Sequence, residues 1–199
     1  MTNLSIGIIV GSTRPGRVGP QVGEWVLANA SAPGVDFEIV DLADYPLPLL
    51  DERHGVGAGN FRNEAANAWA AKIAELDGFL FVTGEYNHTV PGALKNSLDW
   101  LKNELANKAA GIVSYGSMGG VRAGEHLRQI FGELQIADVR QHVMFSLFTE
   151  FPGFMEGKPV FTPTPEAIKK NDLAVLVEQV VAWGSALKGL REQQAELAA

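Results

Sequence analysis

The sequence predicts a doubly wound α/β fold built on a five-stranded parallel sheet. Short apolar runs alternate with segments of helical periodicity along the chain, which is typical of a parallel sheet covered by helices. Two of these runs, Leu4–Val10 and Gly78–Val82, are almost continuously apolar, as expected for strands buried on both faces. Polar, glycine-containing segments follow both runs, at the strand ends where such folds bind ligands.

The composition excludes several classes of function. The 199 residues carry a net charge of −7 and include no cysteine. The acidic balance argues against general binding to nucleic acids or anionic membranes. Without cysteine, disulfides, thiolate catalysis and cysteine-ligated metal centres are excluded. We find no signal peptide and no apolar run that could span a bilayer, so we expect one cytoplasmic domain over residues 1–199.

The first two strand–helix units lie in the amino-terminal 76 residues. Leu4–Val10 is the first expected strand, and Pro20 falls in the first turn of the next helix, where its missing amide is tolerated. That helix has an apolar face formed by Val18, Val22, Trp25 and Val26. Phe37–Asp41 is the second expected strand. The helix after it has an apolar stripe formed by Phe61, Ala65, Ala68, Trp69, Ile73 and Leu76.

Three further units complete the alternation. Gly78–Val82 is the third expected strand, and Pro91 opens the following helix, because proline suits a first helical position. Ala110–Ser114 is the fourth strand, and Val139–Met144 has the weaker pattern of a fifth. A fifth helix begins with Thr164 as its cap. The apolar positions of these three helices are Leu94, Leu98 and Leu101, then Leu127, Ile130, Phe131 and Leu134, then Leu173, Leu176, Val177, Val180, Val181 and Leu187.

Five alternating units favour the strand order 2-1-3-4-5 of flavodoxin-like three-layer sheets. In this order the winding direction changes between strands 1 and 3, and ligands bind beside the carboxyl ends of strands at such a point. The loops after Val10 and Val82 are therefore expected at one crevice. The loop after Ser114 lies beside them because strand 4 adjoins strand 3.

The loop after the first strand has the parts of a phosphate-binding site. It reads Gly11-Ser12-Thr13-Arg14-Pro15-Gly16-Arg17. Gly11 permits a tight turn, and the hydroxyls and arginines suit phosphate oxygens. The next helix adds free amides at its amino end. The alternative interpretation is a plain strand–helix turn with surface arginines.

Two nucleotide-binding motifs resemble this loop but do not fit it. The glycine spacing is that of G-x-x-x-x-G-K-[ST], but Arg17 replaces the lysine and Val18 replaces the magnesium-binding hydroxyl, which disfavours a nucleotide triphosphatase. The dinucleotide pattern G-x-G-x-x-G lacks its second glycine, because Thr13 stands there. Asp41 ends the second strand where an acidic ribose ligand could lie, which keeps the dinucleotide interpretation open.

The loops after the third and fourth strands suit a flat ring. Gly84-Glu85-Tyr86-Asn87 follows the third strand, and its backbone amides could face ring heteroatoms. Ser114-Tyr115-Gly116-Ser117-Met118-Gly119-Gly120 is small and glycine-rich, so a planar ligand can approach its backbone closely. Each loop alone is also compatible with an ordinary connection. Together with the first loop they indicate one ligand with a phosphate at one end and a flat ring at the other.

Other reactive residues give weaker signals. The histidines lack the spacing of metal ligands, so we expect no metal site at His54, His88, His126 or His142. His88 adjoins the expected ring site and is a candidate for tuning it. Gly11-Ser12 lacks the G-x-S-x-G pattern of hydrolases. The polar, glycine-rich segment Glu52–Asn60 is interpreted as a flap over the site or as an exposed connection.

The sequence resembles the NAD(P)H-dependent FMN reductase family of flavodoxin-like proteins, which includes quinone, chromate and azo-dye reductases. The residues that carry the resemblance are Gly11–Arg14, Glu85–Asn87 with Val90–Trp100, and Ser114–Gly120. The resemblance extends from the first strand to about the fourth helix and covers Phe148–Phe154 poorly. Family members commonly have proline where Gly84 stands. They also have a small hydroxyl and an amide where Arg17 and Gly19-Pro20 stand.

The resemblance implies FMN bound without a covalent link. Its phosphate is expected at the first loop and its isoalloxazine ring at the second and third loops. No side chain is expected to act as an acid or base, because the cofactor carries the difficult chemistry. The expected cofactor-binding residues are Gly11, Ser12, Thr13, Arg14, Arg17, Val18, Gly19, Gly84, Glu85, Tyr86, Asn87, Ser114, Tyr115, Gly116 and Ser117.

The implied activity is a ping-pong oxidoreduction. Hydride passes from NAD(P)H to flavin N5, and the electrons then pass to a quinone, free flavin, azo dye or metal oxyanion. The resemblance also implies a homodimer or homotetramer built partly from the third and fourth helices. The alternative function is an FMN-binding electron carrier without NAD(P)H activity, against which the loop arginines and the modest charge density argue. No feature supports a third possibility, a ligand-free scaffold.

Overall fold

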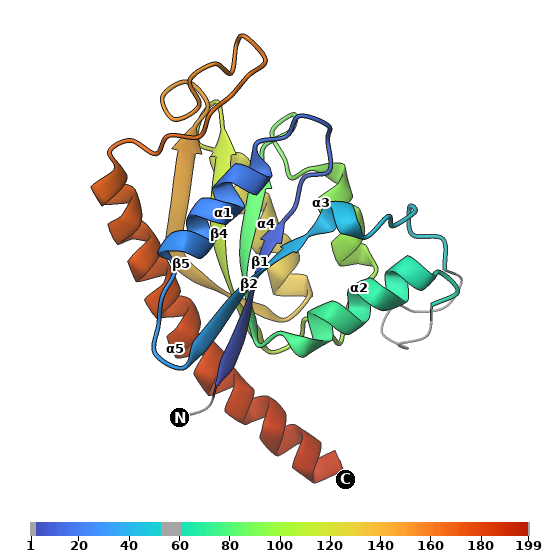
Figure 1. Cartoon of the computed structure of the whole chain (residues 1–199). Helices are drawn as coiled ribbons and strands as arrows, with labels where there is room; N and C mark the ends of the chain where they lie inside the picture. Colours follow the sequence, from blue (N-terminus) through green and yellow to red (C-terminus); the bar gives the residue numbers. More distant parts are fainter. Residues whose placement is uncertain (1–2, 53–60, 199) are drawn as a thin grey trace.

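The computed structural model, which describes residues 3–52 and 61–198, contains the expected five-stranded sheet. All neighbouring strands are parallel, and their order is β2-β1-β3-β4-β5 (Figure 1). The segment interpreted as a flap, Glu52–Asn60, lies outside the described residues except for Glu52. The strands are β1 (Leu4–Val10), β2 (Val35–Asp41), β3 (Gly78–Gly84), β4 (Lys108–Gly116) and β5 (Ile136–Ser146).

Helices cover both faces of the sheet. One face packs against α1 (Gly19–Asn29) and α5 (Glu166–Ala198), and the other packs against α2 (Glu64–Glu75), α3 (Gly92–Asp99) and α4 (Val121–Glu133). A short 3-10 helix, η1 (Leu42–Asp44), follows β2. Successive residues of a strand point to opposite faces. Leu80 and Val82 of β3 therefore enter the core under α1 and α5, whereas Phe79 and Phe81 enter the other core.

Several element boundaries differ from the sequence-based expectation. β2 begins at Val35 rather than Phe37, β3 ends at Gly84 rather than Val82, and β4 spans Lys108–Gly116 rather than Ala110–Ser114. Pro91 is the N-cap of α3 rather than its first residue, so the helix begins at Gly92. β5 extends over Ile136–Ser146, beyond the expected Val139–Met144. It lies at the edge of the sheet, where irregular burial weakens the strand pattern. α5 continues to Ala198, well past Leu187.

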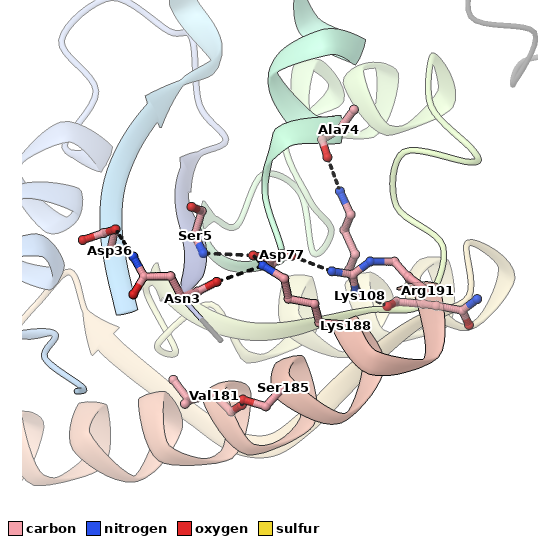
Figure 2. A network of polar contacts seen from close by, with 11 residues as sticks. Asn3, Ser5, Asp36, Ala74, Asp77, Lys108, Val181, Ser185, Lys188 and Arg191 are labelled. Atoms are coloured by element: carbon pink, nitrogen blue, oxygen red, sulfur yellow. Dashed lines mark hydrogen bonds and ion pairs between the residues drawn. The ribbon is translucent and has the colours of Figure 1, made fainter. Parts of the chain in front are cut away.

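The long helix α5 is attached to the sheet in two ways. Leu173, Leu176, Val177 and Val180 are buried in the core with residues of β4 and β5. Near its other end, Lys188 and Arg191 form ion pairs with Asp77, which precedes β3 (Figure 2). By length and composition alone α5 could also cross a membrane. Core packing accounts for part of that apolar character, because 28% of the membrane-length window of α5 is buried.

Candidate functional site

Three loops meet at the carboxyl ends of β1, β3 and β4. The strand register sets this arrangement, since Val10 pairs with Val82 and Gly84 pairs with Tyr115. The loops that leave these positions therefore start side by side. These three loops and a fourth segment, described below, enclose a cavity of about 440 Å³, which we call the site cavity. It is lined by Arg14, Pro15, Gly16, Arg17, Val18, Glu85, Tyr86, Tyr115, Gly116, Leu147, Phe154, Gly157 and Pro159.

The two arginines of the first loop have different surroundings. Arg14 is exposed at the cavity, and no hydrogen bond or ion pair engages its side chain among residues 3–52 and 61–198. Arg17 donates from Nη1 and Nη2 to the two carboxylate oxygens of Asp41, at 2.6 and 2.7 Å, and from Nη1 to the Ser12 carbonyl at 2.5 Å. Arg14 is free to bind a ligand, whereas Arg17 already ties the loop to the end of β2.

Ser12 lies beneath the loop rather than on its surface. It is fully buried, and its hydroxyl lies 3.1 Å from the Tyr115 hydroxyl. Burial raises the pKa of Tyr115 to about 12, so this phenol stays protonated and can share its hydrogen bond with Ser12. A side chain at Gly19 would lie 2.7 Å from the Ser12 oxygen, so only glycine fits there. Thr13 and Gly16 are exposed.

The second loop contains a tight hairpin turn. Tyr86 and Thr89 exchange backbone hydrogen bonds of 2.9 and 3.1 Å. Between them Asn87 and His88 have φ values of 49° and 70°, the left-handed pair of a type I′ turn. This turn fixes Tyr86 at the cavity and exposes the Asn87 and His88 side chains.

The third loop is held from below by a polar chain. Ser114 Oγ donates to the Gly119 carbonyl at 2.6 Å, and it lies 2.7 Å from Nε2 of His142. Burial lowers the pKa of His142 to about 4, with a further contribution from Arg128. Because Ser114 has one proton, we infer that neutral His142 donates to it from Nε2. Ser114 is fully buried and supports the loop, while Tyr115 and Gly116 reach the cavity and Ser117 is exposed.

A segment that sequence reasoning missed forms the fourth wall of the cavity. Residues 150–162 fold back as a hairpin-like arm, in which Thr162 N donates to Glu150 O at 2.8 Å and Val160 N donates to Pro152 O at 2.9 Å. Figure 1 shows this arm in orange above the ends of β4 and β5. Phe154, Gly157 and Pro159 of the arm line the cavity.

The residues of the cavity fit FMN. A volume of about 440 Å³ lies within the usual range of cofactor sites. On the first loop, Arg14 has no side-chain partner among the described residues. α1 begins at Gly19 without any side-chain cap, so the amides at its start, apart from Pro20, which has none, are available to an anion. From the second and third loops, Tyr86 contributes an aromatic ring to the lining and Gly116 contributes backbone without a side chain. This donor set suits a phosphate joined to a flat ring.

Two further cavities are partly lined by residues of these loops. A groove of about 600 Å³ between α3 and α4 includes Val90, Ile130 and Leu134 in its lining, and a smaller space of about 230 Å³ lies between Thr13, η1 and α3. Within the described part of the chain, no three His, Cys, Asp or Glu side chains are grouped to hold a metal ion.

Comparison with known proteins agrees with this geometry. The sequence profile described as NADPH-dependent FMN reductase matches residues 4–150. An NAD(P)H-dependent FMN reductase of Schizosaccharomyces pombe is 39% identical over 132 residues, which cover 65% of this chain and 66% of that protein. A quinone reductase of Escherichia coli is 31% identical over 194 residues, covering 94% and 97% of the two chains.

A solved structure supports the fold independently. FerB, a flavoenzyme NAD(P)H:(acceptor) oxidoreductase from Paracoccus denitrificans, superposes with a TM-score of 0.70 at 18% identity, over 90% of this chain and 98% of that one. The expected fold class is confirmed by the sheet order and by this likeness. Because the family profile spans well over half of its residues, the chain belongs to the NADPH-dependent FMN reductase family of oxidoreductases, with FMN as cofactor and NAD(P)H as co-substrate.

Proposed function

We propose that this protein reduces quinones with electrons from NAD(P)H, through FMN held in the site cavity. The observation that carries the proposal is that one cavity joins Arg14 and the start of α1 to Tyr86 and Gly116. Two relatives support a quinone acceptor. One is the E. coli quinone reductase, and the other is a 2-hydroxy-1,4-benzoquinone reductase of a Burkholderia species, 33% identical over 187 residues.

The residues of the first loop divide the work of holding the phosphate. Arg14 is free and exposed at the cavity, so we assign it the direct contact with the phosphate oxygens, together with the amides of Val18 and Gly19. Arg17 has both terminal nitrogens engaged by Asp41, so we give it the role of keeping the loop in shape. Ser12, buried against Tyr115, supports the loop from below.

The second and third loops hold the ring. Glu85 and Tyr86 of the second loop and Tyr115 and Gly116 of the third loop border the same cavity as Arg14. When bound, FMN supplies the chemistry that accepts a hydride and passes on electrons. These loops orient it, and the buried Ser114–His142 chain holds the Gly119 carbonyl and thereby the third loop.

We also propose a homo-oligomer that uses the groove between α3 and α4. Its lining combines apolar Val90, Ile130 and Leu134 with charged Lys95 and Glu133, a mixture that a second copy could match. Light scattering should give a mass at or above twice the 21.4 kDa of one chain. Gln129→Arg, an exposed change in the groove, should shift the mass towards a monomer; a purely monomeric wild-type protein contradicts this assembly.

A cytoplasmic location and a single domain over residues 1–199 complete the proposal. Cytoplasmic NAD(P)H would supply the electrons, and the absence of cysteine suits a reducing compartment. Cell fractionation tests the location, and limited proteolysis of the FMN-loaded protein tests whether the chain behaves as one unit.

The function is tested by a visible absorption spectrum of the purified protein, with FMN added if it is colourless, before and after anaerobic NADPH or NADH. We expect a bound-flavin spectrum that bleaches with at least one nucleotide and steady turnover with menadione as acceptor. Bound flavin that does not bleach would identify an electron carrier instead. Failure to bind flavin would show that the loops are misassigned.

A further inference from the structure

Glu85 connects two loops of the site to the start of α4. Its side chain is only 5% exposed, and its carboxylate accepts hydrogen bonds from Arg122, from the backbone amide at 3.2 Å, from Nε at 2.6 Å and from Nη2. The amide of Glu85 donates to the Tyr115 carbonyl at 3.1 Å. One residue of the second loop therefore holds both the third loop and the helix that follows it.

The carboxylate of Glu85 also supplies what α4 lacks in its own sequence. The N-cap of α4 is Gly120, which makes no side-chain cap, and the first turn contains no acidic residue. A helix start presents unpaired amides and a partial positive charge, which a carboxylate stabilises. Glu85 provides this negative charge from the second loop. The same hydrogen bonds therefore stabilise the start of α4 and fix the position of the Glu85 carboxylate.

The charges at the site cavity are balanced in pairs. Among the described residues that line it, the charged side chains are Arg14, Arg17 and Glu85. Arg17 is paired with Asp41, and Glu85 is paired with Arg122, whose side chain is 36% exposed. Arg14 remains as the free charge for the phosphate. The cavity lining therefore includes the carboxylate of Glu85 beside Tyr86, and the guanidinium of Arg122, which is not itself part of the lining, balances its charge.

We propose that the Glu85–Arg122 pair sets the reduction potential of the bound flavin. The inference rests on the proposed function, in which the ring lies beside Glu85 and Tyr86. A hydride carries two electrons and one proton, so its transfer from NAD(P)H to a neutral oxidised ring adds one negative charge. A carboxylate at short range opposes that charge and a guanidinium favours it. The charge of each partner offsets that of the other. The intact pair therefore keeps the reduction potential between the lower value expected with the carboxylate alone and the higher value expected with the guanidinium alone.

The test is the midpoint potential of the FMN-loaded protein, measured by equilibration with a reference dye. Glu85→Gln keeps the side-chain shape but leaves Arg122 unmasked, so the reduced form should gain at least tenfold in relative affinity. For a two-electron couple that is about 30 mV more positive. Arg122→Gln leaves the carboxylate unmasked and should shift the potential by a similar amount in the negative direction. The double variant should return close to the wild-type value.

Two further variants separate charge from shape. Arg122→Lys keeps the positive charge and should keep the potential near that of wild type even where FMN affinity falls. Glu75→Gln removes a carboxylate that is 69% exposed at the far end of α2, and should leave the potential unchanged. Thermal melts of each loaded variant show whether the fold is retained.

The outcomes distinguish this inference from the function beneath it. Shifts of opposite sign in Glu85→Gln and Arg122→Gln support the pair as the tuning element. Shifts of the same sign, or none larger than in Glu75→Gln, overturn it while the flavoenzyme function stands. If the wild-type protein binds no FMN, the proposed function fails and this inference fails with it.

Discussion

Asp77 is the residue whose loss should most weaken the attachment of α5. It lies between α2 and β3 (Figure 2), at the amino ends of the strands, whereas the site cavity lies at their carboxyl ends. One carboxylate oxygen accepts from the Ser5 amide at 3.1 Å and from Lys188 Nζ at 2.9 Å, and the other accepts from Arg191 Nη2 at 2.6 Å. Asp77→Asn removes the charge and preserves the size of the side chain.

The magnitude follows from the number and burial of these contacts. Two charge-assisted hydrogen bonds contribute about 1.5–3 kcal/mol each when shielded from water. Lys188 and Arg191 are 23% and 22% exposed, which reduces both contributions. Lys108 lies nearby, and burial together with Arg191 lowers its pKa to about 8 while Asp77 opposes that shift. Without Asp77 the repulsion between these cations is unbalanced, so we expect a loss of about 2–4 kcal/mol.

Thermal and urea unfolding followed by circular dichroism measure this loss. For a domain of this size each kcal/mol lowers Tm by about 2–4 °C, so a loss of about 2–4 kcal/mol should lower Tm by roughly 4–16 °C. Asp51→Asn is the matched control, because Asp51 is 70% exposed and its ion pair with Arg62 is long, at 4.0 Å. FMN affinity should not change in either variant. A stability loss below about 1 kcal/mol in Asp77→Asn would show that apolar packing alone holds α5.

Three further predictions concern the site. Arg14→Ala should weaken FMN binding by about 1.5–3 kcal/mol in a fluorescence titration, with the exposed Arg62→Ala as control, and an unchanged Kd would refute the phosphate assignment. Gly84→Ala would place a methyl 3.0 Å from the Tyr115 ring and should cost about 1–2 kcal/mol in urea unfolding, whereas Gly92→Ala meets no atom within 4 Å and should be neutral. The pKa of His142 is about 4 in the folded protein, against 6.5 for an unperturbed histidine. Between pH 4 and pH 6.5 the unfolded chain therefore binds more protons than the folded protein. Stability is therefore full above pH 6.5 and should decline by up to about 3 kcal/mol as pH falls to 4. His142→Gln should flatten that decline, and an equal slope in both proteins would contradict the assignment.

The central strands could be predicted from the sequence because both of their faces are buried. All seven residues of β3 are buried, so the apolar run marks the strand directly. β5 lies at the sheet edge and has an irregular burial pattern, so the sequence pattern predicted only Val139–Met144 of the strand Ile136–Ser146. The end of α5 was missed because apolar periodicity stops near Leu187. The remaining residues are mostly exposed, and their glutamates, glutamines and alanines form a helix by intrinsic propensity.

The arm shows which part of the site local patterns cannot find. Its position depends on Glu150, which is 2% exposed and accepts from the Ser146 amide at 2.6 Å and from Lys169 Nζ at 3.2 Å. The Ser146 contact is local, but Lys169 comes from α5, so that contact is tertiary and leaves no periodic signal. The one available hint was composition, because aromatic residues cluster there around two glycines, Gly153 and Gly157. Both have φ above 70°, as the turn of the arm requires.

Arg17 shows how strand register decides between two interpretations that composition leaves open. In sequence, Arg14 and Arg17 look equivalent as phosphate ligands, and Asp41 looks like a separate ribose ligand. In the parallel sheet, however, Val10 pairs with Asp41, so the loop after β1 leaves the sheet beside the Asp41 carboxylate. An arginine in that loop gains a bidentate partner without any ligand. A phosphate that bound Arg17 would have to displace the Asp41 carboxylate. Arg14 has no such partner among the described residues, so we assign the direct contact with the phosphate to Arg14.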